Sequence, residues 1–495
     1  MEGENSNLTT DDSVDFDERL PFRSKLAYGL SQASVNLLVS IALGSAITFY
    51  YNIKLGLSEE WVSLAWLIFA VWNAINDPLF GILQERIDTD MGRRIPVLRY
   101  GAPFYTITFI MCWFPFLGNT QIALFWNLLL VLFLFDTMFT MVGLVQTALP
   151  AEMCITQEAR SNLALYNVIL GTFGGLFASV LTLILLTETV TTTLNPLFQP
   201  AMILLGIIAG TILFGASYFL TENEYARTEE TLNFKDSMVE TLKNREFLAF
   251  EGMTFFREMA FTIVTGSMIY LIQYVMVLTG VLASIPLLAV FVVMIVFSLL
   301  ADKMVKTRGL KQVYINGLIA TSIGLVFLFF SGSIFFAALF SLVIVGVGLA
   351  PVLMIWSPLL ADVMDYDEIL TGKRRETTYA GMNALITKPA ISIANAAFLL
   401  IISGFGFDNA ESVQPASALL GIEIAYALFP AILLLICAFI FWKWYALDGQ
   451  DWIAKKVELG KIRLQKEKVY IEQLKKEGKI SKTYEKLYRD PHEEN

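Results

Sequence analysis

The sequence predicts an all-α membrane protein with about twelve transmembrane helices, and three observations support this fold class. Hydrophobic residues make up 56% of the 495 residues and charged residues only 16%, whereas soluble domains carry about a quarter charged residues. Apolar stretches recur that are long enough to cross a bilayer core of about 30 Å. Basic residues gather in every second connection between these stretches, as expected for a chain that crosses a membrane repeatedly.

The apolar stretches place the expected spans along most of the chain. We expect them near 25–52, 61–83, 97–117, 122–149, 161–187, 199–221, 247–278, 281–300, 311–330, 334–360, 380–403 and 420–446. The chain then divides into an N-terminal segment (1–24), two six-helix bundles (25–221 and 247–446), a charged linker (222–246) and a C-terminal tail (447–495). The first residues are acidic and polar, which is unlike a cleavable signal peptide.

The distribution of charge predicts the orientation. The basic connections contain Arg86, Arg93, Arg94 and Arg99; Lys235, Lys243 and Arg245; Lys303, Lys306, Arg308 and Lys311; and Lys373, Arg374 and Arg375. By the positive-inside rule, we expect a multi-pass protein of the cell membrane with both termini in the cytoplasm. The acids behind the net charge of −10 are concentrated in the N-terminal segment, the linker and the tail, so no nucleic-acid partner is implied.

Residue types that carry enzymatic or metal chemistry are scarce in the spans. The three cysteines, Cys112, Cys154 and Cys437, lack metal or disulfide spacing, and the one histidine, His492, lies in the tail. No nucleophile motif is recognisable. We therefore expect no metal, no cofactor and no enzymatic activity.

Two loops suggest that the halves of the chain are structural repeats. The segments 81–94 and 301–311 share the order acid, base, then glycine with flanking bases. Each lies about one third of the way through a six-span half, as expected for the internal repeats of transporters. The alternative is that any short cytoplasmic loop is rich in Arg, Lys and Gly.

The loop at 81–94 resembles the signature of the major facilitator superfamily. The segment 72–81, Trp-Asn-Ala-Ile-Asn-Asp-Pro-Leu-Phe-Gly, closely resembles the melibiose permease family of glycoside, pentoside and hexuronide cation symporters. Further matches are Lys25-Leu-Ala-Tyr-Gly29, Phe49-Tyr-Tyr51 with Gly56-Leu-Ser58, and Asp365-Tyr-Asp-Glu368 with Arg374, Glu376 and Lys388, so the resemblance covers about 25–446. It implies the major facilitator fold, with two six-helix pseudo-repeats that work by alternating access. It also implies symport of a small solute with H+ or Na+, and we expect a monomer in the lipid bilayer.

Asn73 and Asp77 are four residues apart and therefore share one helix face. In the resembled family both matching positions are usually aspartates of the cation site. The asparagine removes one charge, which favours proton coupling or weak cation binding, although Asp136 on span four could restore that charge. The alternative for Asp77 is a helix-end carboxylate paired with a loop arginine.

Lys388 matches the lysine on span eleven of the resembled family. Counted at about 1.5 Å per residue from the loops, it lies about 14 Å deep, and a buried ammonium needs a carboxylate partner. Asp77 and Asp136 are the candidates. A pair that cation or proton binding breaks would give coupling, whereas the alternative is a static packing pair.

Span seven carries three charges, Glu251, Arg257 and Glu258, in an otherwise apolar stretch. Arg257 could hold an anionic substrate group through its planar guanidinium, or could simply neutralise Glu258 or an acid on a facing helix. Glu251 is close to the cytoplasmic edge, so we expect a solvated helix end there.

A further set of loop residues resembles the cytoplasmic gate of the family, whose ion pairs close the inner side of the outward-open state. The set consists of Glu85, Arg86, Arg93, Arg94, Glu152, Glu158 and Arg160, with Asp365 and Arg374 from the second half. Partly exposed ion pairs are easily broken, as a gate requires. The alternative is that these charges satisfy only the topology.

Solute recognition is where the sequence departs from the resembled family. Galactoside carriers of that family use carboxylates on spans one and four and an arginine on span five, and the matching regions here carry Gln32 and Leu37, Val142, and Asn167 with Val168. This argues against an ordinary galactoside. The candidate solute-binding residues are Gln32, Asn36, Gln146, Asn167, Arg257 and Lys388. We expect symport of a sugar or glycoside-like solute, with a carrier of a lysolipid or other amphiphilic or anionic solute as the alternative.

Overall fold

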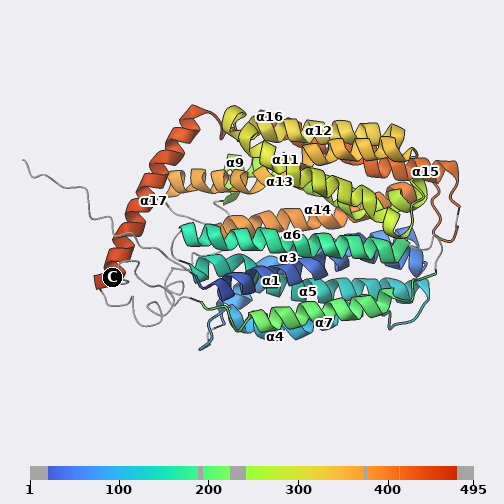
Figure 1. Cartoon of the computed structure of the whole chain (residues 1–495), viewed down its shortest axis with the longest axis horizontal. Coiled ribbons are helices and arrows are strands. Elements are labelled where there is room, and N and C mark those ends of the chain that lie inside the picture. Colours follow the sequence, from blue (N-terminus) through green and yellow to red (C-terminus); the bar gives the residue numbers. More distant parts are fainter. Residues whose placement is uncertain are drawn as a thin grey trace, which may run out of the picture.

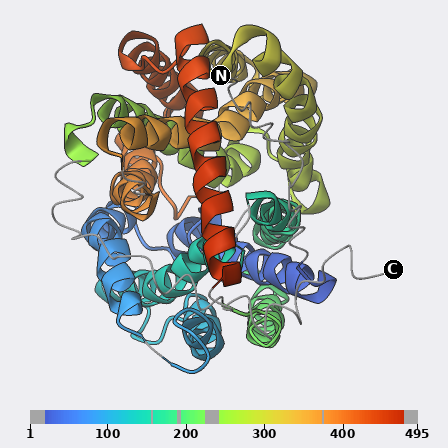
Figure 2. The ribbon, with the colours of Figure 1, turned by 90° about the vertical axis from the view of Figure 1, so that its left-hand side faces the viewer.

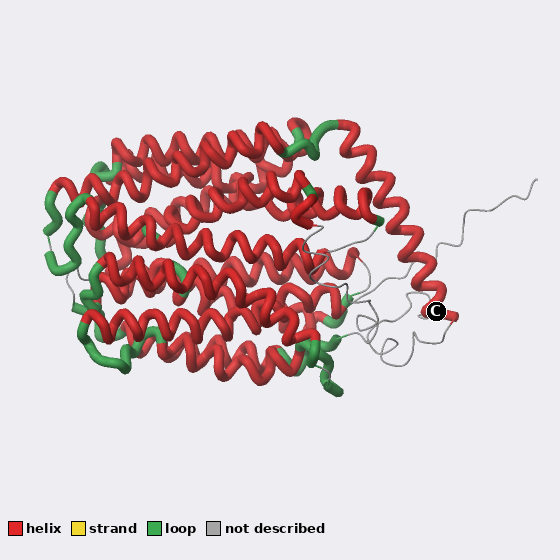
Figure 3. The backbone as a smooth tube through the Cα atoms, turned by 180° about the vertical axis from the view of Figure 1, so that it is seen from behind, coloured by secondary structure: helices red, strands yellow, loops and turns green. Residues whose placement is uncertain are grey.

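The computed structural model describes residues 20–87, 89–154, 157–187, 193–222, 241–372, 376–411 and 413–476. Within these ranges every regular element is a helix (Figure 3). The helices of the N-terminal half are α1 (Phe22–Ala42), α2 (Ser45–Phe49), the π-helical turn η1 (Tyr50–Lys54), α3 (Glu59–Glu85), α4 (Ile95–Met111), α5 (Gln121–Met153), α6 (Gln157–Thr187) and α7 (Phe198–Ala216).

The C-terminal half has the same organisation. Its helices are α9 (Arg245–Gly266), α10 (Met268–Tyr270), the π-helical turn η3 (Leu271–Val275), the 3-10 turn η4 (Gly280–Ser284), α11 (Ile285–Arg308), α12 (Leu310–Ser331), α13 (Phe335–Thr371), α14 (Glu376–Gly404), α15 (Ala416–Glu423), the π-helical turn η5 (Ile424–Leu428) and α16 (Phe429–Trp444). One more helix, α17 (Gln450–Lys476), follows in the tail.

The predicted spans correspond one by one to helices of the structure. Eleven helical stretches among the described residues are long and apolar enough to cross a membrane. The twelfth predicted span, 97–117, corresponds to α4, whose 17 residues measure about 26 Å at 1.5 Å per residue. α4 is shorter than its neighbours but packs against both α5 and α7, so the expectation of an all-α membrane protein is confirmed.

The bundle has two ends, which we name by their connections. The tail end holds the connection 86–94 and α17, which lies across it (Figures 1 and 2). The opposite end holds the connections 55–58 and 405–415. The two halves meet along α3 and α14, which pack against each other extensively, and again where α6 meets η4.

Glycines permit close approach of helix backbones inside each half. A Cβ atom on Gly317 of α12 would lie 2.8 Å from the carbonyl oxygen of Gly348 on α13. A Cβ on Gly174 of α6 would lie 2.4 Å from the carbonyl oxygen of Ala33 on α1. In a bilayer no hydrophobic driving force brings helices together, so close van der Waals packing at small residues contributes to their association instead. The α1–α6 contact brings together the polar residues described below.

The turns η1 and η3 show the internal repeat in detail. The N–H groups of Leu55 and Leu57 donate to the carbonyls of Tyr50 and Tyr51, each at 2.9 Å. Met276 and Leu278 make the same two bonds, also at 2.9 Å, to the carbonyls of Leu271 and Ile272. Gly56 has a φ of 71°, and the equivalent Val277 has a φ of 54°, a value that is strained for a β-branched residue. The two halves therefore repeat even this irregular turn.

Candidate functional site

A cluster of charges joins the two halves in the middle of the bundle. The ammonium of Lys388 on α14 is hydrogen-bonded to Asp77 on α3. It also donates to Thr140 on α5 at 2.8 Å and to the Oδ1 atom of Asn76 at 3.2 Å. The Oδ1 atom of Asp136 lies 3.9 Å away. One lysine therefore contacts residues of two helices in the other half. We call these five residues the Lys388 cluster.

Two of its members, Asn76 and Thr140, were not among the residues predicted from the sequence. Asn76 donates to Asp136 and, at 3.0 Å, to Thr140, and Thr140 donates to Asp77 at 3.0 Å. Both were detectable, because Asn76 lies within the segment 72–81 and Thr140 is one helical turn from Asp136. They connect the two carboxylates into one network.

Asn73 has a different environment from the one expected for a cation ligand. Its Nδ2 atom donates to the backbone carbonyl of Lys388 at 3.1 Å and to Ser392 at 3.3 Å, while its Oδ1 atom is buried without a hydrogen-bond partner. The amide thus holds α3 against α14. In this structure it contacts the helix that carries the lysine.

The charges of the Lys388 cluster do not balance. Two carboxylates face one ammonium, and Asp136, 1% exposed, keeps its Oδ1 atom without a hydrogen-bond donor. Burying an uncompensated charge is costly. The cluster can therefore accept one more positive charge, either as a proton on a carboxylate or as a small cation.

The four amide residues predicted to bind solute lie in two neighbouring hydrogen-bonded groups of the N-terminal half, which together we call the polar network. Gln32 donates to Asn36 at 2.8 Å along α1. The amide of Asn167 on α6 donates to the hydroxyl of Tyr28 at 2.9 Å, and that hydroxyl donates to the carbonyl of Gln146 on α5, also at 2.9 Å.

The two parts of this network meet at a glycine of α6. A Cβ atom on Gly171 would lie 2.8 Å from the amide nitrogen of Asn36 and 3.5 Å from the amide oxygen of Asn167. Gln146 is tied to α1 as well, because its amide donates to Ser31 at 2.9 Å. The structure therefore brings these predicted residues together on α1, α5 and α6.

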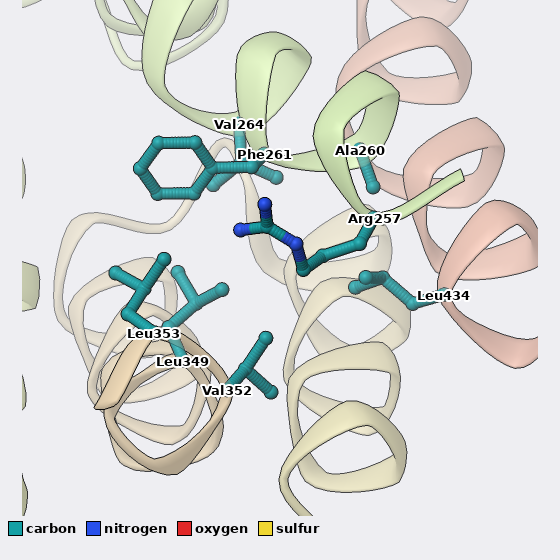
Figure 4. A pocket seen from close by; sticks show the side chains of 8 residues that line it. All are labelled: Arg257, Ala260, Phe261, Val264, Leu349, Val352, Leu353 and Leu434. Atoms are coloured by element: carbon teal, nitrogen blue, oxygen red, sulfur yellow. The ribbon is translucent and has the colours of Figure 1, made fainter. Parts of the chain in front are cut away.

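Arg257 lies apart from this network, inside the C-terminal half. Its guanidinium bonds to Glu258 at 2.5 Å and lies 5.3 Å from the ring centroid of Trp356. It points into a small apolar pocket (Figure 4) lined by Ala260, Phe261, Val264, Leu349, Val352, Leu353 and Leu434. In this structure Arg257 pairs with Glu258, and its role in holding an anionic solute group stays a prediction.

The expectation of a solvated helix end at Glu251 is wrong. Glu251 is 2% exposed, and both of its carboxylate oxygens are buried without a hydrogen-bond partner. The prediction rested on depth along the helix, and depth does not say which face of the helix a side chain occupies. Glu251 lies on the face of α9 that packs inside the half.

At the tail end, two of the predicted gate residues, Arg94 and Glu152, pair with each other within the N-terminal half. Arg94 bonds to Glu152 at 2.9 Å and to the Oε1 atom of Gln84 at 3.1 Å. Burial raises the pKa of Glu152, and the charge of Arg94 opposes that shift. The carboxylate of Glu222 accepts from the backbone N–H groups of Arg93, Arg94 and Ile95, at 2.7, 2.6 and 2.8 Å, where it suits the positive end of α4.

The remaining predicted gate residues differ in their contacts, and the side chains of three of them are not described. Arg160 donates to the carbonyl of Cys154 at 3.0 Å, and Arg86 is exposed. The side chains of Glu85 and Glu158, and the whole of Arg374, lie outside the described residues. Asp365 pairs with Arg463 of α17 at 2.6 Å.

The tail helix makes further contacts with α13. Arg463 also bonds to Glu368 at 2.5 Å, and Lys456 bonds to Asp362, which accepts in addition from the indole of Trp452 at 3.1 Å. Sequence reasoning had assigned no role to this tail. These bonds fix α17 to the end of α13.

At the opposite end, hydrogen bonds join the two halves directly. The hydroxyl of Tyr270 donates to the Oδ1 atom of Asn52 at 2.9 Å, and the amide of Asn52 donates to Glu59 at 2.9 Å. Asn409 donates to the carbonyls of Asn52 at 3.0 Å and Leu57 at 2.9 Å. Asn52 is fully buried, so the halves are packed tightly at this end.

The fold and these sites define a polytopic membrane transporter of the major facilitator type rather than an enzyme. The chain belongs to the family described as MFS/sugar transport protein, whose model matches residues 27–449. The expected superfamily, the resemblance to cation symporters and the assignment as a transporter are thereby confirmed.

Similar proteins span nearly the whole chain. The inner membrane symporter YicJ of Escherichia coli (strain K12) is 23% identical, covering 91% of this chain and 98% of the relative. The isoprimeverose transporter of Lactiplantibacillus pentosus is 22% identical, covering 87% and 90%. Among solved structures, a D-xylose-proton symporter matches with a TM-score of 0.62 and 15% identity, over 86% of this chain and 98% of its own. At that identity the structural likeness shows the fold.

Proposed function

We propose that this protein is a secondary active symporter of the cell membrane that moves a sugar or glycoside-like solute together with a coupling cation. The observation that supports this most is the Lys388 cluster. It joins the two halves through one ammonium that faces two carboxylates. Names of similar proteins agree, among them a putative glycoside/cation symporter, YagG of Escherichia coli (strain K12).

Coupling follows from competition for the carboxylates. A proton or cation that binds at Asp77 or Asp136 replaces the positive charge of Lys388. The bond between α14 and α3 then weakens, which lets the halves change their relative position. Because the occupant and the lysine exclude each other, movement of the halves is linked to ion binding, as symport requires.

We favour the proton as the coupling ion. Asn73 replaces an expected carboxylate and uses its amide to hold the backbone of α14. The one carboxylate that α3 contributes to the Lys388 cluster is therefore that of Asp77. Asp136 is buried deeply enough that neutralisation by a proton relieves the cost of its charge. A sodium ion would need several oxygen ligands, and the oxygens of the Lys388 cluster would have to give up their present hydrogen bonds together to provide them.

The contacts between the halves also suggest the state that the structure represents. The described cross-half bonds run from the Lys388 cluster to Ser403–Glu60 and Asn409–Asn52 at the opposite end. With both termini in the cytoplasm, as the positive-inside rule predicts, this is an inward-facing state of a monomeric carrier. The gate pairs that would close the tail end in the outward-facing state then form only after the halves move.

The polar network of α1, α5 and α6 is our candidate for solute binding. Amides and a tyrosine hydroxyl both donate and accept, which suits sugar hydroxyls. The alternative carrier of an anionic amphiphile relies on Arg257, and the bond of Arg257 to Glu258 leaves it little free charge in this state. We therefore place the sugar-like solute first.

Uptake into proteoliposomes tests the function. Purified protein is reconstituted and offered labelled sugars, uronides and lysolipids, with and without an imposed pH or sodium gradient. We expect one class to accumulate only when a gradient is present. Absence of gradient-dependent flux for every solute would exclude a symporter of these classes.

A matched pair of variants tests the solute site. Gln32 and Gln312 each donate to an asparagine one helical turn further on, at 2.8 and 2.9 Å, but Gln312 is exposed on α12. We expect Gln32→Ala to raise the KM for the solute by about tenfold, the loss of about one charge-neutral hydrogen bond, and Gln312→Ala to leave KM unchanged. Equal effects of both would remove Gln32 from the site.

A further inference from the structure

The buried carboxylate of Glu251 has no described group to balance its charge. It lies on α9, about 9 Å along the helix from Arg245 at 1.5 Å per residue, and neither of its oxygens has a hydrogen-bond partner. Arg257 follows six residues later on the same helix, but its guanidinium is already bonded to Glu258. An ionised carboxylate in this environment is strongly disfavoured.

Two neighbouring helices run in register past Glu251. Both α9 and α14 run from the tail end to the opposite end. Near their starts, the amide of Asn244 donates to the hydroxyl of Tyr379 at 2.9 Å, and the rings of Phe247 and Tyr379 lie 4.9 Å apart. One turn further along each helix, the same faces carry Glu251 on α9 and Asn383 on α14.

The seam at this level contains two more unpartnered oxygens. The Oδ1 atom of Asn383 and the hydroxyl of Thr254, three residues after Glu251, are both buried without a hydrogen-bond partner. Buried polar atoms are normally satisfied. By this register a carboxylate, a hydroxyl and an amide oxygen lie within about one helical turn of each other along the α9–α14 seam, and all three lack the positive or hydrogen-donating partner that buried oxygens need.

We propose that Glu251, Thr254 and Asn383 form a second binding site for a monovalent cation, a proton or sodium, within the C-terminal half. Oxygen donors are the ligands that small hard cations prefer, and a proton on Glu251 would supply the missing donor as well. This site is distinct from the Lys388 cluster, in which Lys388 bonds to residues of α3 and α5. Its occupancy is measurable without transport and does not depend on the proposed coupling.

Thermal unfolding tests sodium as the occupant. The full-length protein in lipid nanodiscs is heated in sodium chloride and in choline chloride at equal ionic strength, since an ion that binds the folded state raises Tm with its concentration. If sodium binds, Tm rises with sodium in the native protein and in Glu458→Gln, an exposed acid of α17. That rise is lost in Glu251→Gln, and Thr254→Val requires at least tenfold more sodium to reach the same rise in Tm.

Infrared spectroscopy tests the proton. If Tm is the same in both salts, the native protein at neutral pH must show the carbonyl band of a protonated carboxylic acid that Glu251→Gln removes and Glu458→Gln retains. If Glu251→Gln does not fold, Glu251→Asp must shift that band instead. The proposal is overturned if replacing Glu251 changes neither the sodium response nor the band.

Discussion

Two of the buried ion pairs that the structure describes inside this bundle differ in where their partners are. Lys388 of α14 bonds to Asp77 of α3, so its ion pair spans the two halves. Arg257 bonds to Glu258 of the same helix and lies against Trp356 of α13, so its contacts stay within one half. Alternating access moves one half relative to the other. We therefore expect only the first group to rearrange during the cycle, and on the proposed mechanism the location of the partner distinguishes coupling charges from packing charges.

Removing Lys388 gives the largest expected effect. Lys388→Ala leaves Asp77 and Asp136 buried without their ammonium, and breaking a buried pair costs about 3–5 kcal/mol. We expect gradient-driven accumulation in proteoliposomes to fall by at least about a hundredfold. The control is Lys306→Ala, whose ion pair with Asp302 at 2.6 Å is exposed. Normal accumulation by Lys388→Ala would show that the pair is static.

Neutralising Asp77 is expected to separate coupling from exchange. In Asp77→Asn the amide can still accept a hydrogen bond from Lys388 and Thr140, so the halves remain able to close and move. We expect loss of uphill accumulation but partial retention of solute exchange, measured by counterflow of labelled solute. Unchanged accumulation would assign Asp77 a structural role.

The Arg257–Glu258 pair is expected to affect stability more than transport. Glu258→Gln leaves the guanidinium with a neutral partner in a largely buried site, which costs about 1–3 kcal/mol. We expect a lower Tm and an unchanged ratio of ion to solute transported. A changed ratio at an unchanged Tm would contradict the distinction between the two groups.

Hydrophobic length and charge distribution are sufficient to predict most of the fold. A span is a local property, and each predicted span corresponds to a helix. Even α4, which forms the shortest span, contains no charged residue after Arg99. The π-helical turns η1 and η3 were not predicted, because a single turn of this kind leaves no periodic signal in the sequence.

The candidate site is only partly predictable, for a related reason. Lys388, Asp77 and Asp136 stand out because charge is rare in apolar segments. Asn76 and Thr140 are neutral and can be found only by their positions, within the segment 72–81 and one helical turn from Asp136. The pairing of Asp365 with Arg463 joins segments far apart in sequence. Glu251 was misplaced because burial depends on the angle around the helix as well as the depth along it. The local sequence determines neither the partner of a charged side chain nor its angle around the helix.

The smallest expected effect concerns the opposite end, where Tyr270 bonds across the halves to Asn52 at 2.9 Å. A matched tyrosine, Tyr426, is equally buried but donates to the carbonyl of Val264 at 2.9 Å within its own half. A hydrogen bond between membrane helices contributes about 0.6 kcal/mol on average. Tyr270→Phe should therefore shift the population toward the state open at this end by about threefold.

Spin labels at the exposed positions Asn119 and Val413 report that opening as an increased fraction of long distances in pulsed electron paramagnetic resonance. Tyr426→Phe loses a comparable bond, so the two variants should have a similarly lowered Tm. Only Tyr270→Phe should change the distance distribution. This difference follows only if a bond affects the conformational equilibrium when its partners belong to different halves. Equal shifts in the two variants would mean that loosening any buried contact opens this end, and the distinction between cross-half and within-half contacts would then not hold.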